Sequence, residues 1–131
     1  PGAALGGAHQ PAGCCLLILG DAADRVDVIR SGTALHERQW YFIAATFDAE
    51  TGIARLIQRP LDPIVGDPVE VARLVATGPI DGKNNVPLAM GAFLCESGGR
   101  EKPVARLNGK IDRPRLASVA LDDGAIAALA G

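Results

Sequence analysis

The amino-acid sequence predicts an all-β protein: an antiparallel β-sandwich with a short C-terminal helix. Short apolar or alternating segments recur along the chain, and Gly, Pro and Asp separate them, which is the pattern of strands joined by turns. The hydrophobic period changes only near the C-terminus, where the apolar residues take helical spacing.

Composition sets limits on the fold and on the partners. The chain has 131 residues, 48% of them hydrophobic, which is enough for one domain with its own core. Thirteen basic residues are scattered among 15 acidic ones, and the net charge is −2, so we expect no nucleic-acid partner. The longest apolar run, residues 14–19, is far too short to cross a bilayer, so we expect no membrane partner either.

The N-terminal part contains a flexible segment and two predicted strands. Residues 1–13 are mostly Gly, Ala and Pro, which predicts a flexible N-terminal segment. Residues 14–19 read as a buried strand closed by Gly20 and Asp21. Residues 25–30 alternate apolar and polar side chains and form the second predicted strand.

The clearest strand covers residues 40–47, which are aromatic, β-branched and apolar on both alternating faces. We therefore expect it to lie deep in the sandwich, with cover on both sides. Residues 48–52 form a hairpin connection in which Gly52 supplies a positive φ. Residues 53–59 return as the partner strand, with Ala54 and Leu56 on one face and Arg55 and Arg59 on the other.

Loops and strands continue to alternate in the second half. Loops are predicted at residues 60–68, 77–85 and 96–102, where Pro, Gly and polar residues gather. Strands are predicted at residues 69–76, with helix as the alternative, at 88–95 and at 106–116. Pro114 has no N–H to donate and so predicts a bulge or an edge in the last strand.

Residues 120–130 predict the terminal helix. Asp122 can cap it, and Ala125, Ile126 and Leu129 form its apolar face. Gly131 follows the end of this segment.

Three segments, in order, resemble the laminin-G-like, concanavalin A-like family of jelly rolls. Residues 38–48 resemble the family's Trp-containing strand, residues 51–57 its hairpin partner, and residues 107–116 with 120–122 its closing signature. The resemblance implies that residues 14–131 form an antiparallel jelly-roll β-sandwich. The family's opening strand has no counterpart, so we expect the module to lack its first strand.

A narrower resemblance concerns the end of the hairpin. The family's usual Tyr-x-Asn-Gly is replaced by residues 57–61, which together with residues 110–114 are similar to the module in the large subunit of N,N-dimethylformamidase-type bacterial amidases. That resemblance implies that the iron and the hydrolytic residues lie elsewhere in such a subunit. None of those residues maps onto this chain.

The expected function follows from this resemblance. We expect a non-catalytic accessory or assembly module of a larger bacterial protein, whose partners are other domains or subunits, and which is no enzyme by itself. Cys14, Cys15 and Cys95 are odd in number and two are adjacent, which favours reduced thiols and a cytoplasmic location. His9 and His36 lie in no catalytic or metal-binding motif.

No cofactor is expected, and calcium is the one metal considered. Oxygen-rich loops make Asp48, Glu50 and Asp112 its candidate ligands, but no loop has the dense Asp, Asn and Gly pattern of a calcium site. Turn-forming, solvated aspartates are therefore the favoured interpretation. Asp112 shares a face with Pro114 and Leu116, so we expect it to point inward and to pair with an arginine or with loop backbone.

A carbohydrate-binding, lectin-like module is the alternative function. Such sites stack an exposed aromatic side chain against a sugar ring, beside planar polar groups. Trp40, Tyr41, Phe42 and Phe47 crowd onto the strand predicted to be buried, which leaves little aromatic surface for a sugar.

Overall fold

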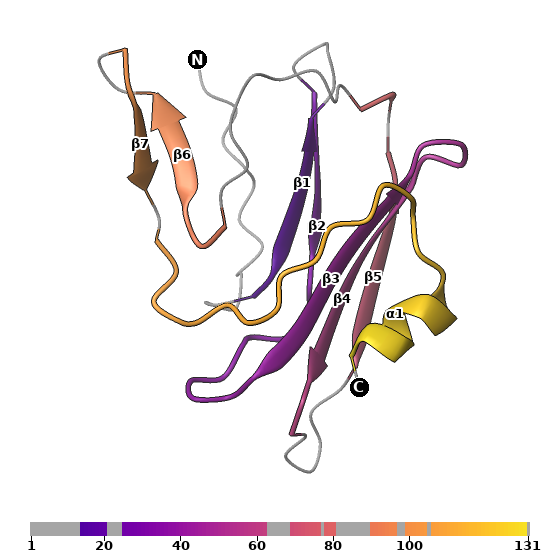
Figure 1. Ribbon diagram of the computed structural model, residues 1–131. Coiled ribbons are helices and arrows are strands. Elements are labelled where there is room, and N and C mark those ends of the chain that lie inside the picture. Colours follow the sequence, from indigo (N-terminus) through magenta and orange to yellow (C-terminus); the bar gives the residue numbers. More distant parts are fainter. Residues whose placement is uncertain are drawn as a thin grey trace. The chain divides into compact units, whose positions relative to one another are not determined.

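The strands of the computed structural model form three antiparallel sheets, and a single short helix lies near the C-terminus of the described chain (Figure 1). The structure describes residues 14–20, 25–62, 69–76, 78–80, 90–96, 99–104 and 106–130. The elements are β1 (Leu16–Gly20), β2 (Val26–Arg30), β3 (Tyr41–Asp48), β4 (Ile53–Pro60), β5 (Glu70–Val75), β6 (Phe93–Glu96), β7 (Glu101–Val104) and α1 (Asp123–Leu129). The chain divides into a first unit, Pro1–Asp81 with Val119–Gly131, and a second unit, Gly82–Ser118.

The first unit is built around the sheet β3-β4-β5, in which β4 is the central strand. The register places Leu56 opposite Ala45 on β3 and opposite Ala72 on β5. Because side chains alternate along a strand, Ala54, Leu56 and Gln58 share one face of the sheet. Arg55, Ile57 and Arg59 share the other, as the sequence predicts for the two arginines.

The hairpin of β1 and β2 packs on the first of these faces. Its Ile29 joins Ala54 and Leu56 in the buried core. Partly buried apolar residues surround this core: Cys15, Leu17, Leu19, Phe47, Ala72 and Leu74. The first unit therefore contains two β layers packed together, a sandwich-like arrangement whose sheets are not closed.

Helix α1 covers part of the opposite face of the sheet, where Val71 and Val75 on β5 are still 49% and 66% exposed. Ile126 is its buried residue, and Ile57 is buried on β4. The Arg55 side chain donates to the Asp123 carboxylate and to the Leu121 carbonyl oxygen, which ties β4 to the start of the helix. The predicted helix and its Asp122 cap are confirmed, although Ala125, expected on the apolar face, is exposed.

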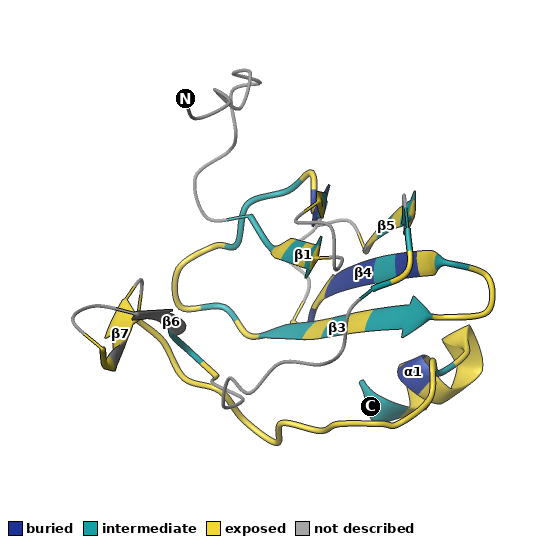
Figure 2. Cartoon of the chain, turned by 90° about the horizontal axis from the view of Figure 1, so that it is seen from above, coloured by how far each residue is buried: buried dark blue, intermediate teal, exposed yellow. Residues whose placement is uncertain are grey.

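The strand predicted to be most deeply buried, β3, lies at the edge of its sheet. β3 pairs with β4 alone, and its residues are half-buried or exposed, whereas β4 is covered on both faces (Figure 2). The prediction that residues 40–47 lie deep in the sandwich is therefore wrong. How deeply a strand is buried therefore depends on its place in the sheet, and its hydrophobicity alone does not predict that place.

The connection between β3 and β4 confirms the predicted turn. Gly52 has φ +69°, a left-handed conformation that glycine adopts without strain, and its N–H donates to the Asp48 carbonyl oxygen at 2.8 Å. All eight residues of β3 find a partner on β4 in the resulting register.

The second unit contains the hairpin of β6 and β7. β7 occupies part of the predicted loop at residues 96–102, so that loop is shorter than expected. The strand predicted at residues 106–116 is wrong, because its described residues are neither helix nor strand and Arg113 has φ +46°. The third segment of the family resemblance is therefore not a strand here.

The strands predicted at residues 25–30, 40–47, 53–59 and 69–76 are confirmed to within one residue as β2, β3, β4 and β5. The strand predicted at residues 14–19 forms as β1, but Leu16 and Ile18 are exposed, so the prediction that it is buried is wrong for one of its sides. The strand predicted at residues 88–95 is confirmed only at its end, because β6 begins at Phe93 and residues 90–92 are not strand. The flexible segment predicted at residues 1–13 lies outside the described residues. Among the described residues, no helix is long and apolar enough to cross a membrane.

Candidate functional site

The outward side of the β1–β2 hairpin is an exposed apolar surface. Register pairs Ile18 with Val28 and Gly20 with Val26, so the side chains of Leu16, Ile18, Val26 and Val28 lie on one side of the hairpin. We call these four residues the outer hairpin face. Ile18 is 56% exposed, Val26 59% and Leu16 47%.

An alternating hairpin normally carries polar side chains on the side that faces water. Here both sides are apolar, because Leu17, Leu19 and Ile29 fill the side that packs on the sheet. Each apolar side chain left in water forgoes a stabilisation of roughly 25 cal/mol per Å² of area that could be buried. Clustered exposed apolar residues of this kind are typical of surfaces that bind a partner.

Hydrogen bonds join the two chain ends of this hairpin, at Cys15 before β1 and Ser31 after β2. The Ser31 N–H donates to the Cys15 carbonyl oxygen at 2.9 Å, and the Cys15 N–H donates to Ser31 Oγ at 2.9 Å. Ser31 Oγ in turn donates to the Thr33 carbonyl oxygen, which also accepts from Gln58 Nε2 at 3.2 Å. The hairpin is thus connected to the centre of β4 through buried polar groups.

Gln58 is the most buried large side chain in this network. Its Oε1 atom has no hydrogen-bond donor among the described residues. Sequence reasoning missed Gln58, because alternation along one strand does not show that a hairpin from elsewhere in the chain packs over it.

A second surface feature is a hollow of about 250 Å³ before β3. It is lined by His36, Glu37, Arg38, Gln39, Trp40 and Asp62. Trp40 is 47% exposed, so the expectation that the aromatic side chains of residues 40–47 leave little surface for a sugar is wrong for this residue. The expectation assumed a deeply buried strand, whereas β3 lies at the edge of its sheet and its Ile43 is also 43% exposed.

The wall of this hollow is fixed by hydrogen bonds. Gln39 Nε2 donates to the Asp62 carbonyl oxygen at 2.8 Å, and Gln39 Oε1 accepts from Tyr41 Oη at 3.1 Å. Tyr41 Oη also accepts from the His36 N–H at 3.0 Å. These bonds hold the planar amide of Gln39 in the wall of the hollow that Trp40 also lines.

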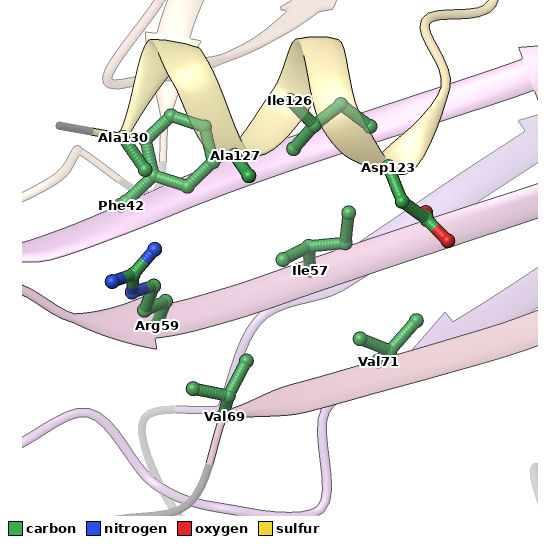
Figure 3. A pocket seen from close by; sticks show the side chains of 9 residues that line it. All are labelled: Phe42, Ile57, Arg59, Val69, Val71, Asp123, Ile126, Ala127 and Ala130. Atoms are coloured by element: carbon green, nitrogen blue, oxygen red, sulfur yellow. The ribbon is translucent and has the colours of Figure 1, made fainter.

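A third feature, the helix-side cavity, lies between α1 and the sheet and has a volume of about 160 Å³. Figure 3 shows its lining residues, Phe42, Ile57, Arg59, Val69, Val71, Asp123, Ile126, Ala127 and Ala130. Sequence reasoning placed Arg59 on the face opposite Leu56 but gave no sign that the helix packs there.

The candidate calcium ligands have other roles in the structure. The Asp48 carboxylate accepts from Thr51 Oγ1 at 2.7 Å and from the Glu50 N–H at 2.9 Å, and these bonds hold the pKa of Asp48 below its usual value. Glu50 is an exposed residue of the same turn. Among the described residues, no group of three His, Cys, Asp or Glu side chains is placed to hold a metal ion.

Asp112, in the second unit, is exposed, so the prediction that it points inward is wrong. Asp112 does pair with an arginine, the adjacent Arg113, whose Nε lies 3.0 Å from Asp112 Oδ2. Both side chains are solvent-exposed, so this pair contributes little to stability. The inward prediction failed because it assumed a strand at residues 106–116.

The other chemically reactive residues are separated from one another. His36 is exposed at the hollow, and the half-buried Cys14 and Cys15 form no disulfide with each other. His9 and the side chain of Cys95 lie outside what the structure describes.

Comparison of the chain with known protein families, with curated proteins and with solved structures finds no match.

Proposed function

We propose that this chain is an accessory or assembly module that packs against another domain or subunit of a larger bacterial protein. The observation that carries the proposal is the outer hairpin face, where Leu16, Ile18 and Val26 are about half exposed on a well-anchored hairpin. Burying these side chains against a partner would stabilise the complex through the hydrophobic effect.

The chemistry of this face indicates the kind of partner. Its four side chains are branched and apolar, and Arg30, which lies opposite Leu16 in the register, is the charged residue at its end. The apolar side of a β-hairpin packs well on the apolar face of another β-sheet. We therefore propose such a sheet, in another part of the larger protein, as the partner.

The narrower form of the proposal is a laminin-G-like jelly-roll module of an N,N-dimethylformamidase-type amidase. The β3–β4 hairpin with its Gly52 turn and the capped helix α1 agree with that resemblance. The lack of a strand at residues 106–116 weighs against it. The packing role depends on the outer hairpin face and does not require this family assignment.

A binding titration between the chain and the remainder of the larger protein tests the packing role. The double variant Ile18→Thr/Val26→Thr keeps β-branched side chains in the hairpin but removes apolar surface, so we expect the dissociation constant to rise about tenfold. Val75→Thr makes the same change at another exposed strand residue and should leave the affinity unchanged. A monomeric chain with no affinity for the remainder would contradict the proposal.

Carbohydrate binding is the second candidate function, favoured by the exposed Trp40 ring beside the planar side chains of Gln39 and Arg38. An indole face next to hydrogen-bonding groups can stack on a sugar ring. The hollow of about 250 Å³ has room for one sugar unit.

The chain's single tryptophan provides a direct readout of sugar binding. We expect cellotriose, maltotriose or chitotriose to shift the Trp40 emission saturably, and Trp40→Ala to abolish the heat of binding in calorimetry. Unchanged emission with all three sugars would remove this candidate.

A further inference from the structure

The helix-side cavity has the size and lining of a small-molecule site. Ile57 and Ile126, 7% and 4% exposed, face each other across it from β4 and α1. Val71 extends the apolar floor along β5, and the small Ala127 side chain leaves space beneath the helix.

The volume of the cavity limits the ligand. The helix-side cavity, of about 160 Å³, is open to solvent, since Val69 is 59% and Val71 49% exposed, and its volume is about that of one six-membered ring. A single six-membered ring, or a branched chain of similar size, would therefore fill the space between Ile57, Val71 and Ile126. Such a ligand gains affinity because its apolar surface leaves water.

The two charged residues at the ends of the cavity differ in whether they form an ion pair. Figure 3 shows Asp123 at one end and Arg59 at the other. Asp123 forms an ion pair with Arg55, which neutralises it. Within the described part of the chain no ion pair to Arg59 is present, so its guanidinium gives that end a net positive charge.

We propose that this cavity binds a small apolar carboxylate, with its ring against Ile57 and Ile126 and its carboxylate on Arg59. A guanidinium matches a carboxylate with two parallel hydrogen bonds, which neither an alcohol nor an amide reproduces. Arg59 thus selects an acid over its neutral analogues, and the apolar lining selects the ring. This ligand site lies on the opposite side of the sheet from the β1–β2 hairpin, and it does not depend on the proposed packing role.

Titration of the ¹⁵N-labelled chain with benzoate, followed by amide chemical shifts, tests this site. We expect saturable shifts at β4 and α1, and about tenfold weaker binding of benzamide, which has the same shape without the charge. Equal binding of the two compounds, or no saturable shift in these two elements, would overturn the proposal.

Two variants distinguish the contribution of the Arg59 charge to binding from the contribution of the apolar cavity. Arg59→Gln should weaken benzoate binding about tenfold and leave benzamide binding unchanged, whereas Ala127→Leu should fill the cavity and weaken both. Arg73→Gln is the matched control, because Arg73 shares this face of the sheet without lining the cavity. Unchanged benzoate binding by Arg59→Gln, or an equal loss in Arg73→Gln, would contradict the role of Arg59.

Discussion

At the scale of single residues, Asp48 shows how one side chain fixes a hairpin. Its carboxylate accepts from the Thr51 hydroxyl and from the Glu50 N–H, and these bonds lower the pKa of Asp48. A folded-state pKa below the unfolded value means that the ionised form stabilises the fold above about pH 4. This contribution is lost as the pH falls through the folded-state pKa.

Asp48→Asn tests this pH dependence. We expect the variant to unfold at a lower urea concentration than the wild type at pH 7, because the amide carries no charge to strengthen the turn's hydrogen bonds. At a pH well below about 4, the usual pKa of an aspartate, the difference should shrink, because Asp48 of the wild type takes up a proton as the pH falls through its lowered folded-state pKa. Urea unfolding of both proteins at the two pH values provides the measurement.

Glu50→Gln is the control for this prediction, because it removes a charge from the same turn and keeps the Glu50 backbone N–H. A stability difference between Asp48→Asn and the wild type that stays the same at both pH values would contradict the account.

The sequence was informative about this turn because its geometry is local. The Asp48 to Gly52 spacing predicts both the turn and the positive φ of Gly52, which the structure confirms. Gln58 is the opposite case, because its burial depends on a hairpin from elsewhere in the chain. Trp40 likewise could not be recognised as exposed without knowing where β3 begins and which strands cover it.

At the scale of elements, helix α1 depends on its cap and on one buried side chain. It has seven residues, and isolated helices of that length are marginal in water. Asp122 Oδ1 accepts from the Ala125 N–H at 2.8 Å, and Ile126 is buried against the sheet. These local signals explain why the helix could be predicted from the sequence.

Asp122→Ala should lower the free energy of unfolding by about 1 kcal/mol, because the Ala125 N–H loses its acceptor. Asp122→Asn retains an oxygen acceptor at the same position and should be close to the wild type. Urea denaturation followed by circular dichroism measures both variants. An equal loss of stability in the two variants would show that the capping bond does not support the helix.

Some strands were predicted correctly and one was not, because a segment forms a strand only when another strand pairs with it, whatever its sequence pattern. Residues 53–59 alternate and also find β3 and β5 on either side, so β4 forms as expected. Residues 106–116 alternate as well, but they are paired in no strand. Alternation is a local property, whereas pairing and sheet order are not, so neither the missing strand nor the edge position of β3 was predictable.

At the scale of the whole molecule, the first unit leaves a group of apolar side chains exposed on the β1–β2 hairpin. The hairpin packs on one face of β3-β4-β5 and helix α1 covers part of the other, and within the described residues Ile18 and Val26 on the outer hairpin face are 56% and 59% exposed. A large exposed apolar surface is a liability in water and an advantage in a complex. We therefore propose that this face packs on the apolar sheet of a larger protein.

Solvent accessibility of the Ile18 and Val26 methyl groups, measured by paramagnetic relaxation enhancement with a soluble agent, tests this claim most directly. We predict strong enhancement at both residues in the isolated chain and its loss when the remainder of the larger protein is added. Methyl groups that remain as accessible in the complex as in the isolated chain would contradict the account.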